Sequence, residues 1–583
     1  MSGSAPHDSE RPWLRKYPPH VPPHLDYPNR LLSDVLEEAV RRWGDRTAVI
    51  FYRSRWSYRR LGEAVERFAA ALAREGVGPG DRVALVLPNC PAYPIAFFAT
   101  LRLGASVVQV SPFWVADDLE TLLGSAKPRA AVTLERFYPN LTHGPSGRAI
   151  PVVFVARLRE FYPALERPFV NLVLRRRGWR TDYPRDPRVR SWRQALRSRG
   201  SVPLHRADPV TTVAVLQFTG GTTGTPKAAM LTHRNLLANV QQLDSWDTQR
   251  EPGREVFLAS IPLFHIYGLT FGFLLAIMEG GTVVLQIRSE PAELLRLIDR
   301  YRPTQLPAVP ALYAGLLGRP ELPRYRVGSI RYCVSGSAPL PPDVQRRFEA
   351  ATGGSLVEGY GLTEASPVTH VNPVEGERRP GSIGLPLPDT EQRVVEPDGR
   401  RPLPAGEVGE LEVRGPQVML GYYEQPEETR AVLEDGWLRT GDLARLDEDG
   451  YAYIVDRKKD MINVGGMKVY PREVEEVLRG HPTVADVAVV ASPDPVLGEV
   501  PRAYVVMAPG SAVDGKELIA LVRGHLAHYK APRTVEFRES LPKSAIQKTL
   551  RRALRDEAFR SAGAAAPRSD LPRSTPPPSA PGP

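Results

Sequence analysis

Residues 216–227 read LQFTGGTTGTPK, an apolar run followed by a loop of glycines and hydroxyl residues that a lysine closes. Glycines let backbone N–H groups approach a polyphosphate, threonine hydroxyls add donors, and Lys227 adds a positive charge. The stretch predicts a strand followed by a phosphate-binding loop. It is not the loop of P-loop NTPases, which requires Ser or Thr after the lysine, because Ala228 stands there. The phosphate contacts expected in this loop, besides Lys227, are Thr219, Gly220, Gly221, Thr222, Thr223, Gly224 and Thr225.

The chain before this loop alternates helical and strand patterns. LLSDVLEEAVRRW (31–43) and LGEAVERFAAALAREG (61–76) have helical periodicity, whereas TAVIFY (47–52) and DRVALVLP (81–88) read as strands. Such alternation is typical of crossover units on a mostly parallel sheet, so the fold class predicted is α/β.

Length and composition exclude several classes of protein. A chain of 583 residues is too long for one ordinary core, so two or more domains are expected. No run reaches the roughly 18 apolar residues that a membrane span needs, and the amino terminus lacks the apolar segment of a secretion signal. Cys90 and Cys333 match no metal-ligand spacing, which favours a reducing, cytoplasmic location.

The formal net charge of +10 favours polyanionic partners, namely nucleotides, coenzyme A or acidic lipid surfaces. Nucleic acid is not predicted, because zinc-finger spacing and an aromatic RNA-binding signature are both missing. Basic and apolar side chains interleave over 155–200. This insert is either a solvated excursion or a patch that rests peripherally on the inner face of an anionic membrane. The tail, 561–583, is rich in Ala, Pro, Ser and Arg and is predicted to be disordered.

A second motif, EGYGLTE, occupies residues 358–364. Its aromatic ring can stack on adenine, its hydroxyl can bind a phosphate oxygen, and its carboxylate can hold Mg²⁺. These groups are Tyr360, Thr363 and Glu364. The alternative is a turn that merely exposes a glutamate.

A third motif combines TGD (440–442) with DRKKD (456–460). A carboxylate and a guanidinium are natural partners for ribose hydroxyls, which points to Asp442 and Arg457. Taken alone, Asp442 could equally cap a helix and Arg457 could equally form a surface ion pair.

In their order, these motifs resemble those of the adenylate-forming superfamily of acyl-CoA synthetases, luciferases and peptide-synthetase adenylation domains, over residues 30–560. The resemblance implies a large N-terminal domain of stacked α/β sheets with a small β-barrel subdomain, and a small mobile α+β C-terminal domain. The divisions expected are an extension (1–29), the large adenylation domain (30–456), the small hinge-rotating domain (457–560) and the tail (561–583).

The resemblance also implies ATP, Mg²⁺ and coenzyme A, and it assigns site residues. Nucleotide contacts fall on Glu358, Gly359, Tyr360, Asp442, Arg457 and Lys468, and metal contacts fall on Glu364 and Thr222. Lys459 stands at the hinge, and Gly465 and Gly466 stand in a loop that lines the pantetheine channel. Pro471 suits the first position of the helix expected after this loop. Luciferase and coumarate-CoA ligases carry a lysine where Gly465 stands, which argues against light emission.

The last motif, LPKSAIQK (541–548), resembles the terminal signature whose lysine contacts the carboxylate and the α-phosphate. A cation where two anions meet stabilises the transition state, so Lys548 joins Lys227, Thr363 and Glu364 as a catalytic residue. Gln547 replaces the usual glycine, which alters the turn that positions Lys548. The alternative is a basic tail helix, as KTLRRALR (548–555) suggests.

PLFHIYGL (262–269) and SGSAP (335–339) resemble segments that line the acyl pocket, which assigns the substrate to His265, Tyr267, Gly336 and Ser337. Outside that motif, His265 would read as a core histidine. The predicted activity joins a medium- or long-chain fatty acid to coenzyme A through acyl-AMP, as in bacterial long-chain ligases. Three alternatives are a fatty-acyl-AMP ligase that loads a carrier protein, a coumarate-type aryl-acid ligase, and a degenerate binder without turnover.

Overall fold

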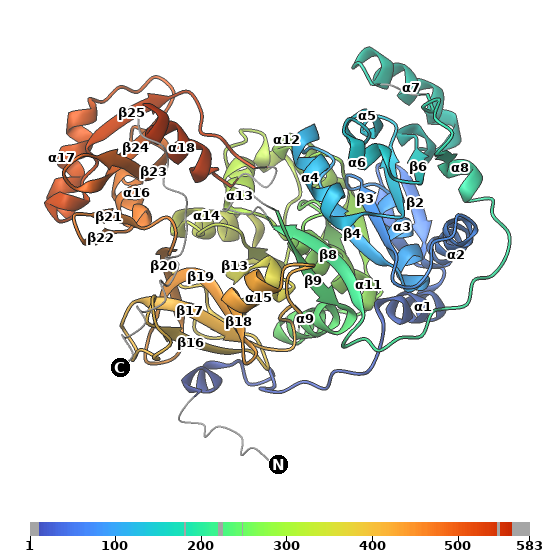
Figure 1. Cartoon of the computed structure of the whole chain (residues 1–583), viewed down its shortest axis with the longest axis horizontal. Coiled ribbons are helices and arrows are strands. Elements are labelled where there is room, and N and C mark those ends of the chain that lie inside the picture. The colour runs from blue at the N-terminus through green and yellow to red at the C-terminus, as the bar shows by residue number, and fades with distance from the viewer. Residues whose placement is uncertain (1–10, 180–181, 220–225, 248, 545–547, 562–583) are drawn as a thin grey trace, which may run out of the picture.

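The structure, a computed structural model, describes residues 11–179, 182–219, 226–247, 249–544 and 548–561. The predicted disordered tail beyond residue 561 and the glycine-rich part of the phosphate loop, 220–225, lie outside the described residues. The described chain is α/β, with three sheets of mixed or parallel strands, one antiparallel sheet, and a fifth sheet at the C-terminal end (Figure 1).

The largest sheet carries the phosphate loop. Its order is β7 (Val189–Ser191), β6 (Val152–Ala156), β5 (Ala130–Leu134), β3 (Arg82–Val86), β4 (Ser106–Val110), β8 (Val213–Thr219) and β9 (Lys227–Thr232). All neighbours are parallel except β8 and β9. Helices α3 (Ala92–Arg102) and α4 (Ala116–Ala126) are crossover helices between its parallel strands, and α2 (Tyr58–Arg74) leads into β3 from another sheet. The predicted alternation over 31–88 is therefore confirmed.

Two further sheets of four strands follow. One is β10 (Val256–Leu258), β11 (Thr282–Leu285), β1 (Thr47–Phe51) and β2 (Ser54–Ser57); the other is β12 (Tyr332–Ser335), β13 (Ser355–Gly361), β14 (Val368–Val371) and β15 (Leu385–Pro386). Their helices are α1 (Leu32–Trp43), α9 (His233–Trp246), α12 (Pro291–Tyr301), α13 (Pro310–Leu317) and α14 (Pro342–Thr352). The two strands predicted over 47–52 and 81–88, β1 and β3, lie in different sheets, because β1 pairs with the distant β11.

The antiparallel sheet stands where a small barrel is predicted. It contains β16 (Glu391–Val395), β17 (Gly409–Arg414), β18 (Leu433–Glu434), β19 (Trp437–Leu446) and β20 (Ala452–Arg457), with α15 (Pro426–Val432) beside it. The described part of the N-terminal extension packs on this region through η2 (Pro12–Lys16). Trp13 is buried there beside Gly450, and the Tyr17 hydroxyl donates to the Pro386 carbonyl at 2.5 Å.

The C-terminal end has a sheet and a hydrophobic core of its own (Figure 1, red and orange). Its strands are β21 (Ile462–Val464), β22 (Met467–Val469), β23 (Val484–Asp494), β24 (Gly498–Met507) and β25 (Thr534–Arg538), and its helices are α16 (Pro471–Arg479), α17 (Gly515–His525) and α18 (Arg551–Ser561). Proline suits the first position of a helix, and α16 begins at Pro471 as predicted. Because β20 continues the antiparallel sheet to Arg457, the core of this unit begins only at Ile462.

The basic insert, 155–200, is only partly an excursion. Strand β7 extends the largest sheet, and Trp192 of α8 (Trp192–Ala195) is fully buried. Between β6 and β7, η3 (Leu158–Phe161), η4 (Ala164–Glu166) and α7 (Arg167–Arg176) leave the sheet, and α7 forms one extremity of the molecule in Figure 1. The remaining short elements are α5 (Tyr138–Leu141), α6 (Pro145–Arg148), α10 (Ile266–Leu269), η5 (Thr270–Leu274), α11 (Leu275–Met278), η6 (Leu322–Arg324), η7 (Thr363–Ala365) and η8 (His528–Lys530).

Candidate functional site

The phosphate loop connects two paired strands. Thr219 ends β8 and Lys227 begins β9, and the two are opposite each other in the antiparallel ladder. The Thr219 hydroxyl donates to the Lys227 carbonyl at 3.4 Å, which closes the base of the loop. The predicted contacts between them lie outside the described residues, namely Gly220, Gly221, Thr222, Thr223, Gly224 and Thr225.

Lys227 and Glu364 share one aromatic residue. The Lys227 ammonium forms an ion pair with Glu428 of α15 and lies 5.4 Å from the centre of the Tyr422 ring. The Tyr422 hydroxyl donates to Glu364 Oε1 at 2.7 Å. Thr363 precedes Glu364 in η7, so the structure brings these three predicted catalytic residues to one place.

The nucleotide motifs meet across two strands. Asp442 on β19 is the register partner of Arg457 on β20, and the Arg457 Nε lies 3.3 Å from Asp442 Oδ1. The Tyr360 hydroxyl donates to Asp442 Oδ2 at 2.5 Å. Burial, followed by the negative charge of Asp442, raises the pKa of the Tyr360 phenol, so Tyr360 stays a neutral donor. Asp442 does not cap a helix, because it lies inside a strand.

Two residues just before Tyr360, Glu358 and Gly359, lie on the same strand, β13. Glu358 is buried on β13, and burial raises the pKa of its carboxyl to about 7. A Cβ on Gly359 would approach Val334 Cγ1 to 2.7 Å, so any larger residue there would force Val334 to shift.

The two predicted acyl segments touch each other. The Tyr267 hydroxyl donates to the Val334 carbonyl at 2.6 Å, and a Cβ on Gly336 would lie 3.3 Å from the Tyr267 ring. His265 precedes α10, and its Nδ1 accepts from the Tyr267 N–H at 3.3 Å. Burial, then the charge of Lys548, lowers the pKa of His265 to about 4, so the neutral ring carries its proton on Nε2. Ser337 is exposed, in the left-handed region at φ 71°.

Lys548 lies between the acyl side and the nucleotide side. Burial lowers the pKa of its ammonium to about 7; Arg457 and Lys459 lower it as well, and Asp442 raises it. The same lysine acts electrostatically on His265. Its backbone closes a loop with Ser544, whose N–H donates to the Lys548 carbonyl at 2.8 Å. Helix α18 begins only at Arg551, so Lys548 is not part of a tail helix; Gln547 lies outside the described residues.

An ion cluster surrounds the predicted hinge. Burial lowers the pKa of Lys459 to about 8, with Arg457 acting in the same direction. Arg551 of α18 lies 2.7 Å from Glu475 on α16, 3.5 Å from Asp460 and 3.7 Å from Asp456. Arg551 therefore links the start of α18, just after Lys548, to the segment that carries the hinge lysine.

Gly465 and Gly466 form the exposed turn between β21 and β22, with φ of 56° and 90°. Their backbone N–H groups donate within the small domain, to the Leu497 carbonyl at 2.9 Å and to Asn463 Oδ1 at 2.8 Å. Lys468 is exposed on β22. Their contacts with coenzyme A and nucleotide stay predictions.

Glu364 fits a magnesium ion only together with phosphate. Among the described residues, no group of three or more His, Cys, Asp or Glu side chains could hold a metal. Mg²⁺ is usually held by one or two carboxylates together with substrate phosphates, so one carboxylate beside a phosphate loop suits it. The second predicted ligand, Thr222, lies outside the described residues.

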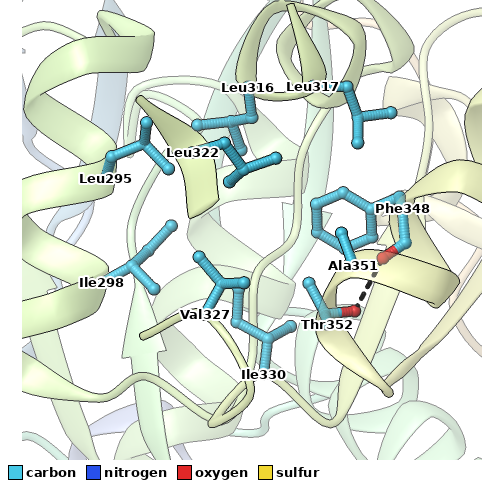
Figure 2. A pocket seen from close by; sticks show the side chains of 10 residues that line it. All are labelled: Leu295, Ile298, Leu316, Leu317, Leu322, Val327, Ile330, Phe348, Ala351 and Thr352. Atoms are coloured by element: carbon cyan, nitrogen blue, oxygen red, sulfur yellow. Dashed lines mark hydrogen bonds between the residues drawn. The ribbon is translucent and has the colours of Figure 1, made fainter. Parts of the chain in front are cut away.

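Figure 2 shows a cavity of about 10 Å³ elsewhere, between α12, α13, η6 and α14. Its walls are apolar except for Thr352, whose hydroxyl donates to the Phe348 carbonyl at 2.9 Å. None of the predicted site residues lines it, and it is too small for a substrate. It is a packing void of the core.

The sequence motifs did not reveal Tyr422, Glu428 or Arg551. Tyr422 and Glu428 stand in GYYEQPEET (421–429), a stretch without a chemical pattern of its own. Arg551 is one arginine in a basic run. Only their partners identify them, and those partners are distant in the chain.

Fold and site together define the class: an enzyme that activates a carboxylic acid with ATP. The chain belongs to the AMP-binding enzyme family, whose model matches residues 36–423, and the model of the AMP-binding enzyme C-terminal domain matches 473–548.

Similar proteins include the long-chain-fatty-acid–CoA ligase of Bacillus subtilis (strain 168), which is 40% identical over 94% of this chain and 98% of its own length. The feruloyl-CoA synthase of an Amycolatopsis species is 36% identical over 86% of this chain and 93% of its own. Among solved structures, the anthranilate CoA ligase AuaEII in complex with anthranoyl-AMP has a TM-score of 0.81 at 25% identity, covering 92% of this chain and 99% of its own.

Proposed function

We propose that the chain ligates a long-chain fatty acid to coenzyme A through an acyl-AMP intermediate, with release of pyrophosphate and AMP from ATP. One observation carries the proposal: the Lys548 ammonium lies near His265 of the acyl side, whose pKa its charge lowers, and near Asp442 of the nucleotide side, whose charge raises the pKa of Lys548. An acid bound beside His265 places its carboxylate near Lys548. A nucleotide bound at Asp442 places its α-phosphate near the same lysine, so the two reacting groups meet there. The 40% identity to a long-chain ligase over nearly the whole chain supports the acid class.

The described residues divide the first half-reaction among them. Asp442 and Arg457 bind the ribose hydroxyls, and Lys227 binds the outer phosphates. His265 donates from Nε2 to the acid, and Lys548 stabilises the charge that develops as the carboxylate attacks the α-phosphate and pyrophosphate leaves. Mg²⁺ at Glu364, when bound, neutralises phosphate charge.

The second half-reaction needs Lys548 to withdraw, because the thiol of coenzyme A attacks the same carbonyl that the lysine faces. Rotation about Lys459 would remove Lys548 and bring in the turn at Gly465 and Gly466. Lys459→Pro restricts the hinge and is expected to spare adenylation and block thioester formation. Equal loss of both half-reactions would contradict the hinge.

Two alternatives differ in acceptor or acid. A carrier protein's phosphopantetheine arm could replace coenzyme A as acceptor. An aryl acid could replace the fatty acid, an alternative that the likeness to a feruloyl-CoA synthase keeps open.

The decisive experiment measures pyrophosphate and AMP release with Mg-ATP across short, medium, long-chain and aryl acids, each with and without coenzyme A. Thioester formed only with coenzyme A, and fastest with long-chain acids, is the expected result. Adenylate that accumulates regardless of coenzyme A would move the assignment to a carrier-protein ligase. A preference for aryl acids would move it to the coumarate type, and no release with any acid would indicate a degenerate binder.

The proposal also includes where the reaction takes place, namely at a membrane surface. No helix of the described chain is long and apolar enough to cross a bilayer. A long-chain acid nevertheless partitions into lipid, so an enzyme at a membrane surface meets more substrate there. Peripheral contact through the insert, 155–200, is part of the proposed function.

A further inference from the structure

Helix α7 presents an apolar face to solvent. Leu165 in η4 and Phe169 and Leu172 in α7 are 96%, 69% and 48% exposed. Their spacing of four and three residues places them on one side of the helix. Leu165 has the highest exposure of any large apolar side chain in the described chain. The opposite side packs inward through the buried Leu174.

The insert that carries this face holds much of the net positive charge of the protein. Residues 155–200 contain 13 Arg against 4 Asp and Glu, a net charge of +9, whereas the whole chain has +10. Three consecutive arginines, Arg175, Arg176 and Arg177, end the helix and are exposed. Arg175 lies 3.7 Å from Asp182, and the charge of Arg177 acts on Glu293. The apolar face is thus bordered by a dense cationic edge.

An apolar face with a cationic edge fits the interface of an anionic bilayer, where apolar side chains enter the acyl boundary and arginines meet phosphate headgroups. Isolated exposed apolar residues need no explanation, but three on one helical face beside an arginine cluster do. A protein partner would need an acidic rim to match this edge, whereas an anionic lipid surface supplies that charge everywhere.

We propose that residues 163–179, here called the docking tip, seat the enzyme on an anionic lipid bilayer, with Leu165, Phe169 and Leu172 inserted and Arg175–Arg177 at the headgroups. This deepens the proposed membrane setting and is independent of the proposed chemistry.

The position of the tip suits that role. Figure 1 shows α7 at one extremity and the small domain, with α17, at the other. Attachment at the docking tip therefore leaves the small domain free to rotate during the two half-reactions.

The first experiment is cosedimentation of the full chain with vesicles of equal parts phosphatidylglycerol and phosphatidylcholine, or of phosphatidylcholine alone. Binding to the anionic vesicles only is expected. The triple change L165S/F169S/L172S and the double change R176E/R177E should each lower the partition coefficient about tenfold or more. The matched controls are V496S, where the side chain is 87% exposed on the small domain, and R346E/R347E on α14. They should bind like the wild type.

A second measurement locates the contact without relying on loss of binding. Cys90 and Cys333 are both buried, so a cysteine placed at Phe169 can be labelled selectively with an environment-sensitive fluorophore. Blue-shifted emission on anionic vesicles is expected from F169C and not from V496C.

The inference is overturned if the wild type binds neither vesicle or both equally, if the tip variants bind unchanged, or if the label at position 169 does not respond. Turnover of a short-chain acid dissolved in buffer separates this from the proposed chemistry. It should be unchanged in the tip variants. Absence of turnover in the wild type with every acid of the panel would contradict the proposed function and leave the docking result standing.

Discussion

Two lysines from opposite sides of the site have opposite surroundings. Lys227, in the large domain, has a carboxylate partner in Glu428 and the face of Tyr422 beside it. Lys548, near the start of α18, is half-buried and loses solvation, and Arg457 and Lys459 add positive charge. The positive charge of Lys227 is stabilised before any substrate arrives, whereas that of Lys548 is destabilised.

The difference separates a fixed residue from a conditional one. Lys227 can stay charged in the free enzyme at little cost, because phosphate only replaces its carboxylate partner. A desolvated lysine among cations is unfavourable until anions arrive, so ATP and the fatty acid should favour the arrangement with Lys548 in place. After pyrophosphate leaves, that support weakens, which fits the withdrawal that the second half-reaction needs.

The largest effect is expected from removing Lys548, the conditional residue of the two. Lys548→Ala should lower the adenylation rate roughly 100- to 1000-fold, the cost of removing one transition-state charge stabiliser. Thioester formation from presynthesised acyl-AMP should be nearly unchanged. Pyrophosphate exchange and thioester assays measure the two steps. Lys543→Ala, which removes a cation paired with Asp486 in the same segment, is the control. Equal loss in both steps would show that Lys548 is structural.

Next, Arg551→Gln should loosen the anchor of α18. Glu475, 2% exposed, would lose its 2.7 Å contact with the guanidinium. A hydrogen bond to a charged group contributes about 1.5–3 kcal/mol, so the free energy of unfolding of the small domain should fall by that order. Denaturant unfolding measures it. Arg552→Gln, on the more exposed side of the same helix, should cost less than about 1 kcal/mol. Similar losses in both variants would contradict the anchor.

The third test uses pH. Lys548 has a pKa of about 7 instead of its usual 10.5, so it is charged below about pH 7 and neutral above it in the free enzyme. The kcat/KM for ATP in adenylation should therefore fall up to about tenfold per pH unit above 7. Because bound anions raise this pKa, kcat should hold to higher pH. Lys548→Arg keeps its charge and should flatten the profile; an unchanged profile would assign it to another group.

The smallest effect is expected at Lys227, the lysine that already has a carboxylate partner. Glu428→Gln removes the anion that competes with phosphate for Lys227. The Glu428 side chain is 44% exposed, and such a pair is worth up to about 1 kcal/mol, so KM for ATP should fall by up to about fivefold. Its neighbour Glu427, which pairs with Arg430, supplies the control variant Glu427→Gln. A KM that rises would show that Glu428 supports binding.

Sequence alone determined the chemistry and much of the α/β fold, because glycine-rich loops, helix starts and periodicity are local signals. It predicted Lys227, Glu364, Asp442 and Lys548 individually, and it predicted a helix that begins at Pro471. It did not predict that β1 and β3 enter different sheets, since strand pairing is decided by distant partners.

Only the tertiary structure decided which groups face one another. Glu428 is 201 residues from Lys227 along the chain, and Tyr422 is 58 from Glu364, so no spacing rule connects them. The depressed pKa of Lys548 and the exposure of Leu165 and Phe169 likewise depend on which surfaces packing buries. Residue types fix which chemistry is available, whereas burial and long-range pairing fix the charge, position and solvent access of each group.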